Sequence, residues 1–156
     1  MINRCAAYPS ILSHLRPNPN TEFLEIGCFM GQNLRRLSAD LYKNDSAATA
    51  PKQLYGSDVS DGIWEVRFDM FQDRKKFNAD FMIANILNIE ASALAPLRGT
   101  FNVVYVCHVM HLFDYSKQLA AAKSLISLTT PCPGAMIVGS QPGAKKAFDM
   151  HYVSFD

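Results

Sequence analysis

The sequence lacks the features that mark several specialised classes of protein. No uninterrupted apolar run approaches the about 20 residues that a membrane-spanning helix needs. Lys and Arg number 15 against 14 Asp and Glu, and this net charge of +1 creates no basic field for a nucleic acid or an anionic membrane. The first residues contain no apolar stretch long enough for a signal peptide. We therefore expect a cytoplasmic protein that binds neither nucleic acid nor membrane.

Cysteines are few and scattered. Cys5, Cys28, Cys107 and Cys132 have no CxxC spacing, which favours reduced thiols in an intracellular protein. Cys107 lies close to His108 and His111, but a strand end would not aim these side chains at one point. No distant Cys/His cluster completes a tetrahedral zinc site. We therefore expect no metal.

The 156 residues, 49% of them hydrophobic and 19% charged, suit a single globular domain and exclude a disordered chain. Continuous apolar runs alternate with stretches of helical period, which predicts an α/β fold with a doubly wound, mainly parallel sheet. We expect strands at residues 21–27, 53–58, 81–84, 101–107 and 135–139, and helices at residues 8–15, 31–41, 63–71 and 115–128. A small polar loop is expected at residues 44–52 and a short helical turn at residues 94–98.

The expected helices carry apolar residues at helical spacing, among them Leu34, Leu37 and Leu41 in the helix at 31–41. In the helix at 115–128, Leu119, Ala122 and Ile126 share one face, as in an amphipathic helix. Trp64 and Phe68 are four residues apart in the helix at 63–71, a spacing typical of side chains that face a core.

A strand, a glycine turn and a helix follow one another at residues 25–31 (EIGCFMG). Gly27 lets the chain leave the strand sharply, and Gly31 lets backbone approach a ligand at the helix start. The turn has neither the GxGxxG pattern of a dinucleotide site nor the Gly-Lys-Ser/Thr ending of a P-loop. These absences disfavour a nicotinamide-dependent redox enzyme and a phosphate ligand.

Asp58 ends the second expected strand. In open α/β sheets a carboxylate at this place can accept both hydroxyls of a ribose. Asp58 also belongs to the sequence Ser57-Asp58-Val59-Ser60-Asp61-Gly62, where an aspartate can simply form a turn. Both interpretations stay open from the residue alone.

Together these segments resemble the class I S-adenosylmethionine-dependent methyltransferases. The glycine turn is similar to their motif I and Asp58 to their ribose-binding acid, while residues 81–87 (FMIANIL) and 101–113 (FNVVYVCHVMHLF) are similar to their third and fourth motifs. A narrower resemblance, to fungal methyltransferases of meroterpenoid and polyketide pathways, is carried by GCFMGQNLR, LYGSD, HLF and IVGSQ. It extends from Tyr8 to Phe155. Phe29 replaces the middle glycine of the motif, and Asn85 and Asn102 replace commoner carboxylates.

The resemblance implies a Rossmann-like sheet with strand order 3-2-1-4-5. It also implies one domain over residues 1–156, made of a helical cap (1–20), a cofactor-binding core (21–143) and an incomplete tail (144–156). That tail would lack most of the usual hairpin of strands 6 and 7. The strand at 135–139 would then be an apolar sheet edge, which invites association with a second chain.

The cofactor that the resemblance implies is S-adenosylmethionine. Glu25, Gly27 and Gly31 would shape the methionine end of its pocket, Asp58 would bind the ribose, and Asn85 with Ile86 would frame the adenine. The full cofactor-binding set that we expect is Glu25, Gly27, Cys28, Phe29, Gly31, Asp58, Val59, Asn85, Ile86, Leu87 and Cys107.

Substrate is expected near Tyr8, His108 and His111. His111 is the best candidate for a general base, because an unperturbed imidazole titrates near neutral pH. Packing against neighbouring elements explains each of these three residues equally simply.

The predicted reaction is methyl transfer to an oxygen, a hydroxyl or a carboxylate, of a small-molecule secondary metabolite. The alternative is an inactive methyltransferase-like domain that acts through a protein partner or as a homodimer.

Overall fold

The computed structural model describes residues 1–42 and 53–143. Both the loop expected at 44–52 and the tail at 144–156 lie outside the described residues. The strands are β1 (Phe23–Ile26), β2 (Leu54–Asp58), β3 (Asp80–Ile83), β4 (Val103–Val106) and β5 (Met136–Val138). The helices are α1 (Tyr8–Leu15), α2 (Gln32–Leu41), α3 (Gly62–Phe71) and α4 (Tyr115–Leu128), with 3-10 turns at Ile2–Arg4, Ile89–Ala91, Ala95–Leu97 and Met110–Leu112.

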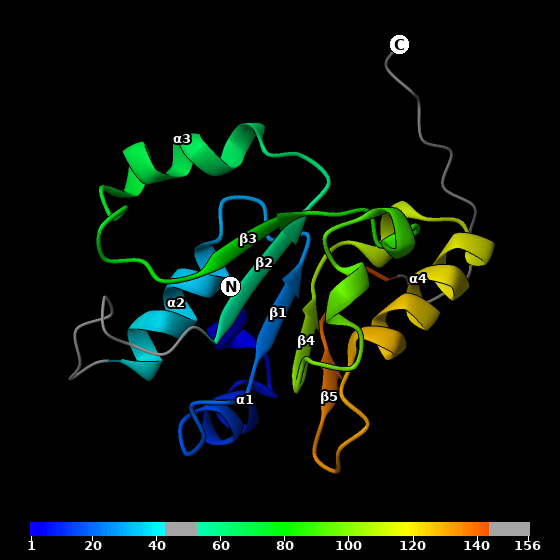
Figure 1. The fold of residues 1–156 in the computed structure, drawn as a ribbon, viewed down its shortest axis with the longest axis horizontal. Coiled ribbons are helices and arrows are strands. Elements are labelled where there is room, and N and C mark those ends of the chain that lie inside the picture. The colour runs from blue at the N-terminus through cyan, green and yellow to red at the C-terminus, as the bar shows by residue number, and fades with distance from the viewer. Residues whose placement is uncertain (43–52, 144–156) are drawn as a thin grey trace.

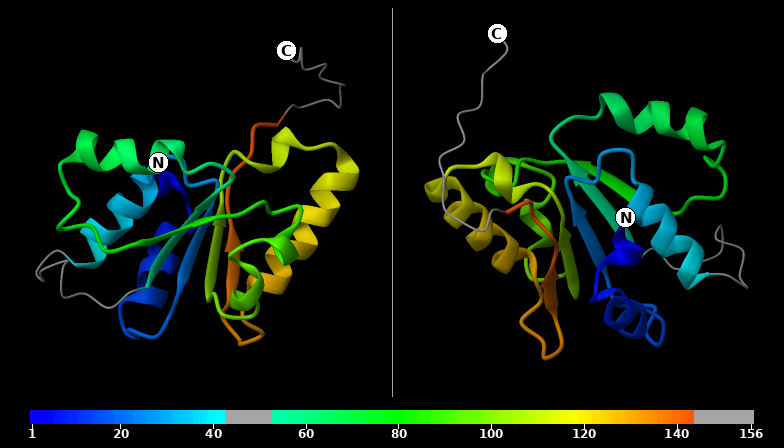
Figure 2. Two further views of the ribbon diagram at one scale, coloured as in Figure 1. Left: turned by 45° about the horizontal axis from the view of Figure 1, so that its top comes forward. Right: turned by 180° about the vertical axis from the view of Figure 1, so that it is seen from behind.

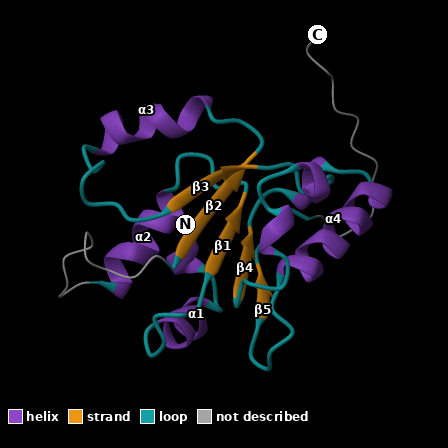
Figure 3. Ribbon diagram, viewed as in Figure 1, coloured by secondary structure: helices purple, strands orange, loops and turns teal. Residues whose placement is uncertain are grey.

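The strands form one sheet in the order β3-β2-β1-β4-β5, and every neighbouring pair is parallel (Figure 3). This arrangement confirms the doubly wound sheet that the alternation of strands and helices predicts, and the strand order that the resemblance implies. β1 lies at the centre, and all four of its side chains are buried. Its Glu25 is in register with Gly56 of β2 and Tyr105 of β4.

Two apolar clusters cover the two faces of the sheet. Figure 2 shows α1, α2 and α3 on one side of the strands and α4 on the other. Phe23 and Val103 point to the first side, where they pack with Ile11, Leu34 and Leu37. Strand residues one position further along point to the second side and pack against α4 and the turns at Ile89–Ala91 and Ala95–Leu97. This burial on both faces explains why the strands are continuous apolar runs.

α4 begins at an N-cap, and the face that it packs against the sheet differs from the face expected from the sequence. The Asp114 carboxylate accepts a hydrogen bond from the backbone N–H of Lys117 over 2.9 Å. The buried residues of the helix are Ala121, Leu125 and Leu128. Leu119 is 49% exposed and Ile126 65% exposed, so the expected face does not lie on the core. The helix carries two apolar rows, and periodicity alone could not choose between them.

The carboxyl ends of the parallel strands meet at one edge of the sheet, the upper edge in Figure 1. In open α/β sheets this edge is where ligands bind, at the point where the chain turns from one half of the sheet to the other. Here that point lies between β1 and β4, which are adjacent although 76 residues of sequence separate Ile26 from Val103. Within the described residues, no helix combines the length and the apolar character that crossing a membrane requires.

Candidate functional site

The glycine turn between β1 and α2 has an unusual backbone. Gly27, Phe29 and Gly31 all have positive φ angles, of 70°, 49° and 68°. A Cβ atom at Gly27 would clash with the side chain of Val109, so this position needs glycine for space as well as for conformation. Phe29 has no such freedom, and a left-handed conformation costs a non-glycine residue about 1–2 kcal/mol. Surrounding contacts must hold this turn in place.

Asp58 supplies one of those contacts. Its Oδ2 atom accepts a hydrogen bond of 2.9 Å from the backbone N–H of Phe29, and its Oδ1 atom accepts one of 2.8 Å from Val59. The carboxylate therefore joins the end of β2 to the glycine turn. Each carboxylate oxygen has a further lone pair, so the same side chain can also accept from a ligand hydroxyl.

Glu25 is a buried carboxyl group behind the turn. Its Oε1 atom accepts a hydrogen bond of 2.7 Å from the Asn33 side chain, and its Oε2 atom has no hydrogen-bond partner among the described residues. Burial raises the pKa of Glu25 to about 8, the nearby charge of Asp58 adds to this rise, and the hydrogen bond from Asn33 opposes it. Asn33 in turn accepts a hydrogen bond from the backbone N–H of Ile2 over 2.8 Å.

A cavity of about 380 Å³ opens at the carboxyl ends of β1 to β4. Among the residues that the sequence singled out, those that line it are Gly27, Asp58, Val59, Asn85, Ile86, Leu87 and His108. At its far end the Asn85 side-chain oxygen accepts a hydrogen bond of 2.9 Å from the backbone N–H of Leu87. The cavity thus joins the glycine turn, an acidic strand end and a polar turn after β3.

The other predicted site residues lie outside this cavity wall. Cys28 is buried against Gly56 and Leu34, where burial raises the pKa of its thiol. Phe29 is half-exposed, and Gly31 precedes the first residue of α2. Cys107 contacts the Ser140 hydroxyl at 3.1 Å, and a nitrogen of His111 lies 3.3 Å from the Gln141 side-chain oxygen.

Tyr8 lies away from the cavity, within the packing of α1 against α2. Its hydroxyl donates a 2.8 Å hydrogen bond to Asp40, whose carboxylate also pairs with Arg36. Burial, strengthened by the Asp40 carboxylate, raises the pKa of Tyr8 to about 12. The structure therefore gives Tyr8 a role in holding two helices together and does not place it on the cavity wall.

Several lining residues were not predicted from the sequence. They are Ile26, Ser57, Ala84, Val109, Leu112 and Phe113. Each stands next to, or within a few residues of, one that was predicted, so the available signal was position after a strand rather than side-chain chemistry.

His108 has a φ of 58°, a left-handed conformation at the end of β4. Over the described ranges 1–42 and 53–143, no group of three or more His, Cys, Asp or Glu side chains is arranged to hold a metal ion.

Comparison with characterised proteins identifies relatives that are similar in sequence. No protein-family model matches the chain. The O-methyltransferase phiE of a fungal species is 33% identical over 137 residues, which cover 88% of this chain and 43% of that protein. The Asnovolin E/Chermesin D methyltransferase nvfJ of Aspergillus novofumigatus is 34% identical over 138 residues, which cover 88% of this chain and 46% of that protein. The chain therefore spans less than half the length of these relatives.

Comparison with solved structures identifies proteins with a similar fold. The trans-methyltransferase CalH, in complex with SAH, superposes with a TM-score of 0.65 at 21% identity, covering 86% of this chain and 36% of that one. A SAM-dependent methyltransferase from Aquifex aeolicus superposes with a TM-score of 0.52 at 15% identity, covering 79% and 58%. The resemblance predicted from the sequence is thus confirmed: the chain has a Rossmann-like fold similar to that of these methyltransferase structures and is similar, over most of its length, to fungal O-methyltransferases.

Proposed function

We propose that this chain is the cofactor-binding core of an S-adenosylmethionine-dependent methyltransferase. The protein would transfer a methyl group to an oxygen, a hydroxyl or a carboxylate, of a small-molecule secondary metabolite. The observation that carries the proposal is the cavity, which brings Gly27, Asp58 and Asn85 together from the ends of three strands. The names of the fungal relatives support the choice of oxygen and of a small molecule.

Each part of the cofactor has a candidate partner among these residues. The Asp58 carboxylate suits the two ribose hydroxyls, because it is a strong acceptor at the end of β2. Asn85, Ile86 and Leu87 offer an amide and apolar surface for the adenine. The methionine end would meet the glycine turn at Gly27, with the buried Glu25 carboxyl group behind it.

The reaction itself asks little acid–base chemistry of the protein. The bound cofactor supplies a methyl group that is already activated for displacement, because it is attached to a positively charged sulfur. The protein residues must orient the acceptor in line with that methyl group and exclude water, and such positioning can supply about 7–11 kcal/mol. His108, on the cavity wall, and His111, three residues later, are the candidates to bind the acceptor. We assign His111 as the general base where the acceptor is a hydroxyl group; a carboxylate acceptor needs none.

An inactive domain that acts through a partner is the weaker alternative. β5 lies at the end of the sheet, and its Ile137 is 41% exposed, so this edge could pair with a second copy of the chain. The presence of Asp58 and of the glycine turn argues against a lost activity, because neither is needed for pairing of the β5 edge with a second chain. Light scattering on the purified chain tests the homodimer, and a sharp monomeric peak would contradict it.

Calorimetric titration with S-adenosylhomocysteine tests the cofactor site. We expect binding to the wild-type chain and at least tenfold weaker binding to Asp58→Ala, a loss of about 1.4 kcal/mol. Asp61→Ala is the matched control, because Asp61 is exposed at the start of α3 and its side chain makes no capping hydrogen bond. No binding by folded wild-type protein, or an equal loss in both variants, would contradict the proposal.

A further inference from the structure

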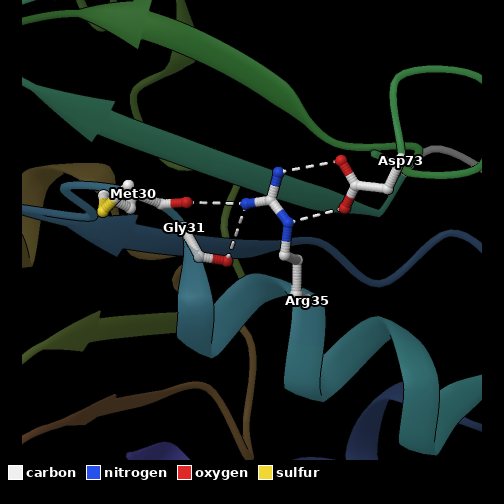
Figure 4. A network of polar contacts seen from close by, with 4 residues as sticks. All are labelled: Met30, Gly31, Arg35 and Asp73. Atoms are coloured by element: carbon white, nitrogen blue, oxygen red, sulfur yellow. Dashed lines mark hydrogen bonds and ion pairs between the residues drawn. The ribbon is translucent and has the colours of Figure 1, made fainter. Parts of the chain in front are cut away.

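Arg35, on the first turns of α2, makes a set of contacts that joins three separate segments (Figure 4). Its Nε and Nη2 atoms donate to the two carboxylate oxygens of Asp73, over 2.6 and 3.1 Å. Its Nη1 atom donates to the backbone carbonyl of Met30 over 2.6 Å and more weakly to that of Gly31 over 3.5 Å. One guanidinium group therefore links the glycine turn to the segment that follows α3.

This pair differs from an ordinary surface ion pair. The side chains of Arg35 and Asp73 are only 12% and 19% exposed. The guanidinium group also lies over the rings of Phe71 and Phe77, with its carbon 4.1 and 4.5 Å from their centres. Both nitrogens of the guanidinium fork and both carboxylate oxygens are used, an arrangement that fixes direction as well as distance.

The start of the glycine turn is held by backbone hydrogen bonds to β2: the N–H groups of Gly27 and Cys28 both donate to the Ser57 carbonyl, over 2.8 and 3.0 Å. Gly31 is the residue before α2 and offers no side chain to cap the helix. Within the turn, the Gly31 N–H donates to the Cys28 carbonyl, and the Phe29 N–H donates to Asp58. The Met30 carbonyl accepts from the Arg35 side chain instead, whereas the Gly31 carbonyl accepts mainly from the Arg35 backbone N–H, over 3.0 Å. Because Phe29 is held in a left-handed conformation, the loss of the side-chain hydrogen bond to the neighbouring Met30 carbonyl should let the turn relax.

We propose that Arg35 and Asp73 are positioning residues that hold the glycine turn in the conformation that receives the methionine end of the cofactor. This inference rests on the function proposed above, and neither residue contacts the cofactor itself. Asp73 fixes the direction of the guanidinium group, and the guanidinium group fixes the Met30 carbonyl of the turn. Asp73 follows α3 closely, and α3 starts soon after Asp58, so the pair also joins the far end of α3 to the glycine turn.

Two ligands separate positioning from general stability. S-adenosylhomocysteine carries the amino-acid part of the cofactor, whereas 5′-methylthioadenosine keeps the adenosine and lacks that part. In Arg35→Lys, which cannot form the fork and reach the carbonyls together, we expect binding of S-adenosylhomocysteine to weaken about tenfold. Binding of 5′-methylthioadenosine should change less than about twofold. Asp73→Asn, which keeps Arg35 but loosens it, should give a smaller loss of the same kind.

Arg74→Gln is the matched control. Arg74 forms an exposed ion pair with Glu65 over 2.8 Å and makes no contact with the glycine turn, so both ligands should bind as to wild type. Equal losses for the two ligands, or no loss in a folded Arg35→Lys or Asp73→Asn variant, would overturn the inference. If Arg35→Lys does not fold, the ratio of the two affinities in Asp73→Asn decides. Failure of the wild-type chain to bind S-adenosylhomocysteine would instead refute the proposed function.

Discussion

α2 and α3 lie on the same face of the sheet and are joined to it very differently. α2 buries Leu34 and Leu37 completely, together with the polar side chains of Ser38 and Asp40. α3 buries only Trp64 and Arg67, and its apolar residues Ile63, Val66, Met70 and Phe71 are exposed. α2 is therefore held by fully buried leucines as well as polar contacts, whereas α3 is held by a few aromatic and cationic contacts. An apolar-rich helix is not always a buried one.

The contacts of α3 explain how a buried cation is tolerated there. Arg67 is fully buried, and its three guanidinium nitrogens have no hydrogen-bond partner within the part of the chain that the structure describes. Its charge lies against the rings of Trp64 and Phe68. Burial lowers the pKa of Arg67 to about 9, and the neighbouring Arg35 cation adds to this. Ring faces attract a cation but do not replace the hydrogen bonds that water would give it.

The largest expected effect comes from emptying the buried side of α2. Leu37→Ala removes a fully buried side chain and should lower the free energy of unfolding by about 2–5 kcal/mol. Urea denaturation followed by circular dichroism measures this loss. Leu119→Ala is the matched control on the open face of α4, and a loss there as large as at Leu37 would break the distinction between covered and open helix faces.

Replacing the buried cation of α3 should have a smaller effect of opposite sign. We expect Arg67→Met to raise the free energy of unfolding by about 1–3 kcal/mol at pH 7, because a buried charge without hydrogen bonds is removed. In the wild type the penalty is complete below pH about 9 and shrinks as pH rises through the window from about 9 toward the unfolded value of 12.5, since the native state releases its proton first.

The gain in thermal midpoint from Arg67→Met should therefore be smaller at pH 10 than at pH 7, measured by differential scanning fluorimetry at both pH values. Arg74→Met, at an exposed arginine whose carbon lies 4.4 Å from the centre of the Phe68 ring, serves as the control. A fall in the midpoint of Arg67→Met would show that the ring contacts outweigh the cost of burying the charge.

The smallest effect is expected on the outer side of α3. Val66 is 58% exposed, so Val66→Ser should change the free energy of unfolding by less than about 0.5 kcal/mol. The measurement is again a urea midpoint, taken at two protein concentrations. A larger loss that grows with concentration would mean that a second chain covers this side of α3 in solution.

The sequence was informative where local backbone chemistry constrains the residue type. Gly27 is required by a positive φ and by the approach of Val109, and Asp58 follows directly from a recognisable strand. The alternation of apolar runs and amphipathic stretches was enough to predict each described strand and helix. The strand order did not come from periodicity but from the resemblance of several weak motifs in a fixed order.

Contacts between distant residues were beyond such a prediction. Nothing local to Tyr8 indicates a hydrogen bond to Asp40, and charge alone would place Arg67 at the surface. Leu112 and Phe113 line the cavity with ordinary apolar side chains, which carry no signal of ligand binding. The pairing of Arg35 with Asp73 needs the packing of α2 against the segment after α3, which only the folded chain provides.

The central place of β1 has a consequence for the newly made chain. β1 pairs with β2 on one side and with β4 on the other, and its side chains are all buried. Its second edge stays open until residues 103–106 have been synthesised. At about 5–20 residues per second, the roughly 80 residues in between take roughly 4–16 s. A translational pause between residues 27 and 102 would lengthen the time for which this apolar strand is open to other nascent chains.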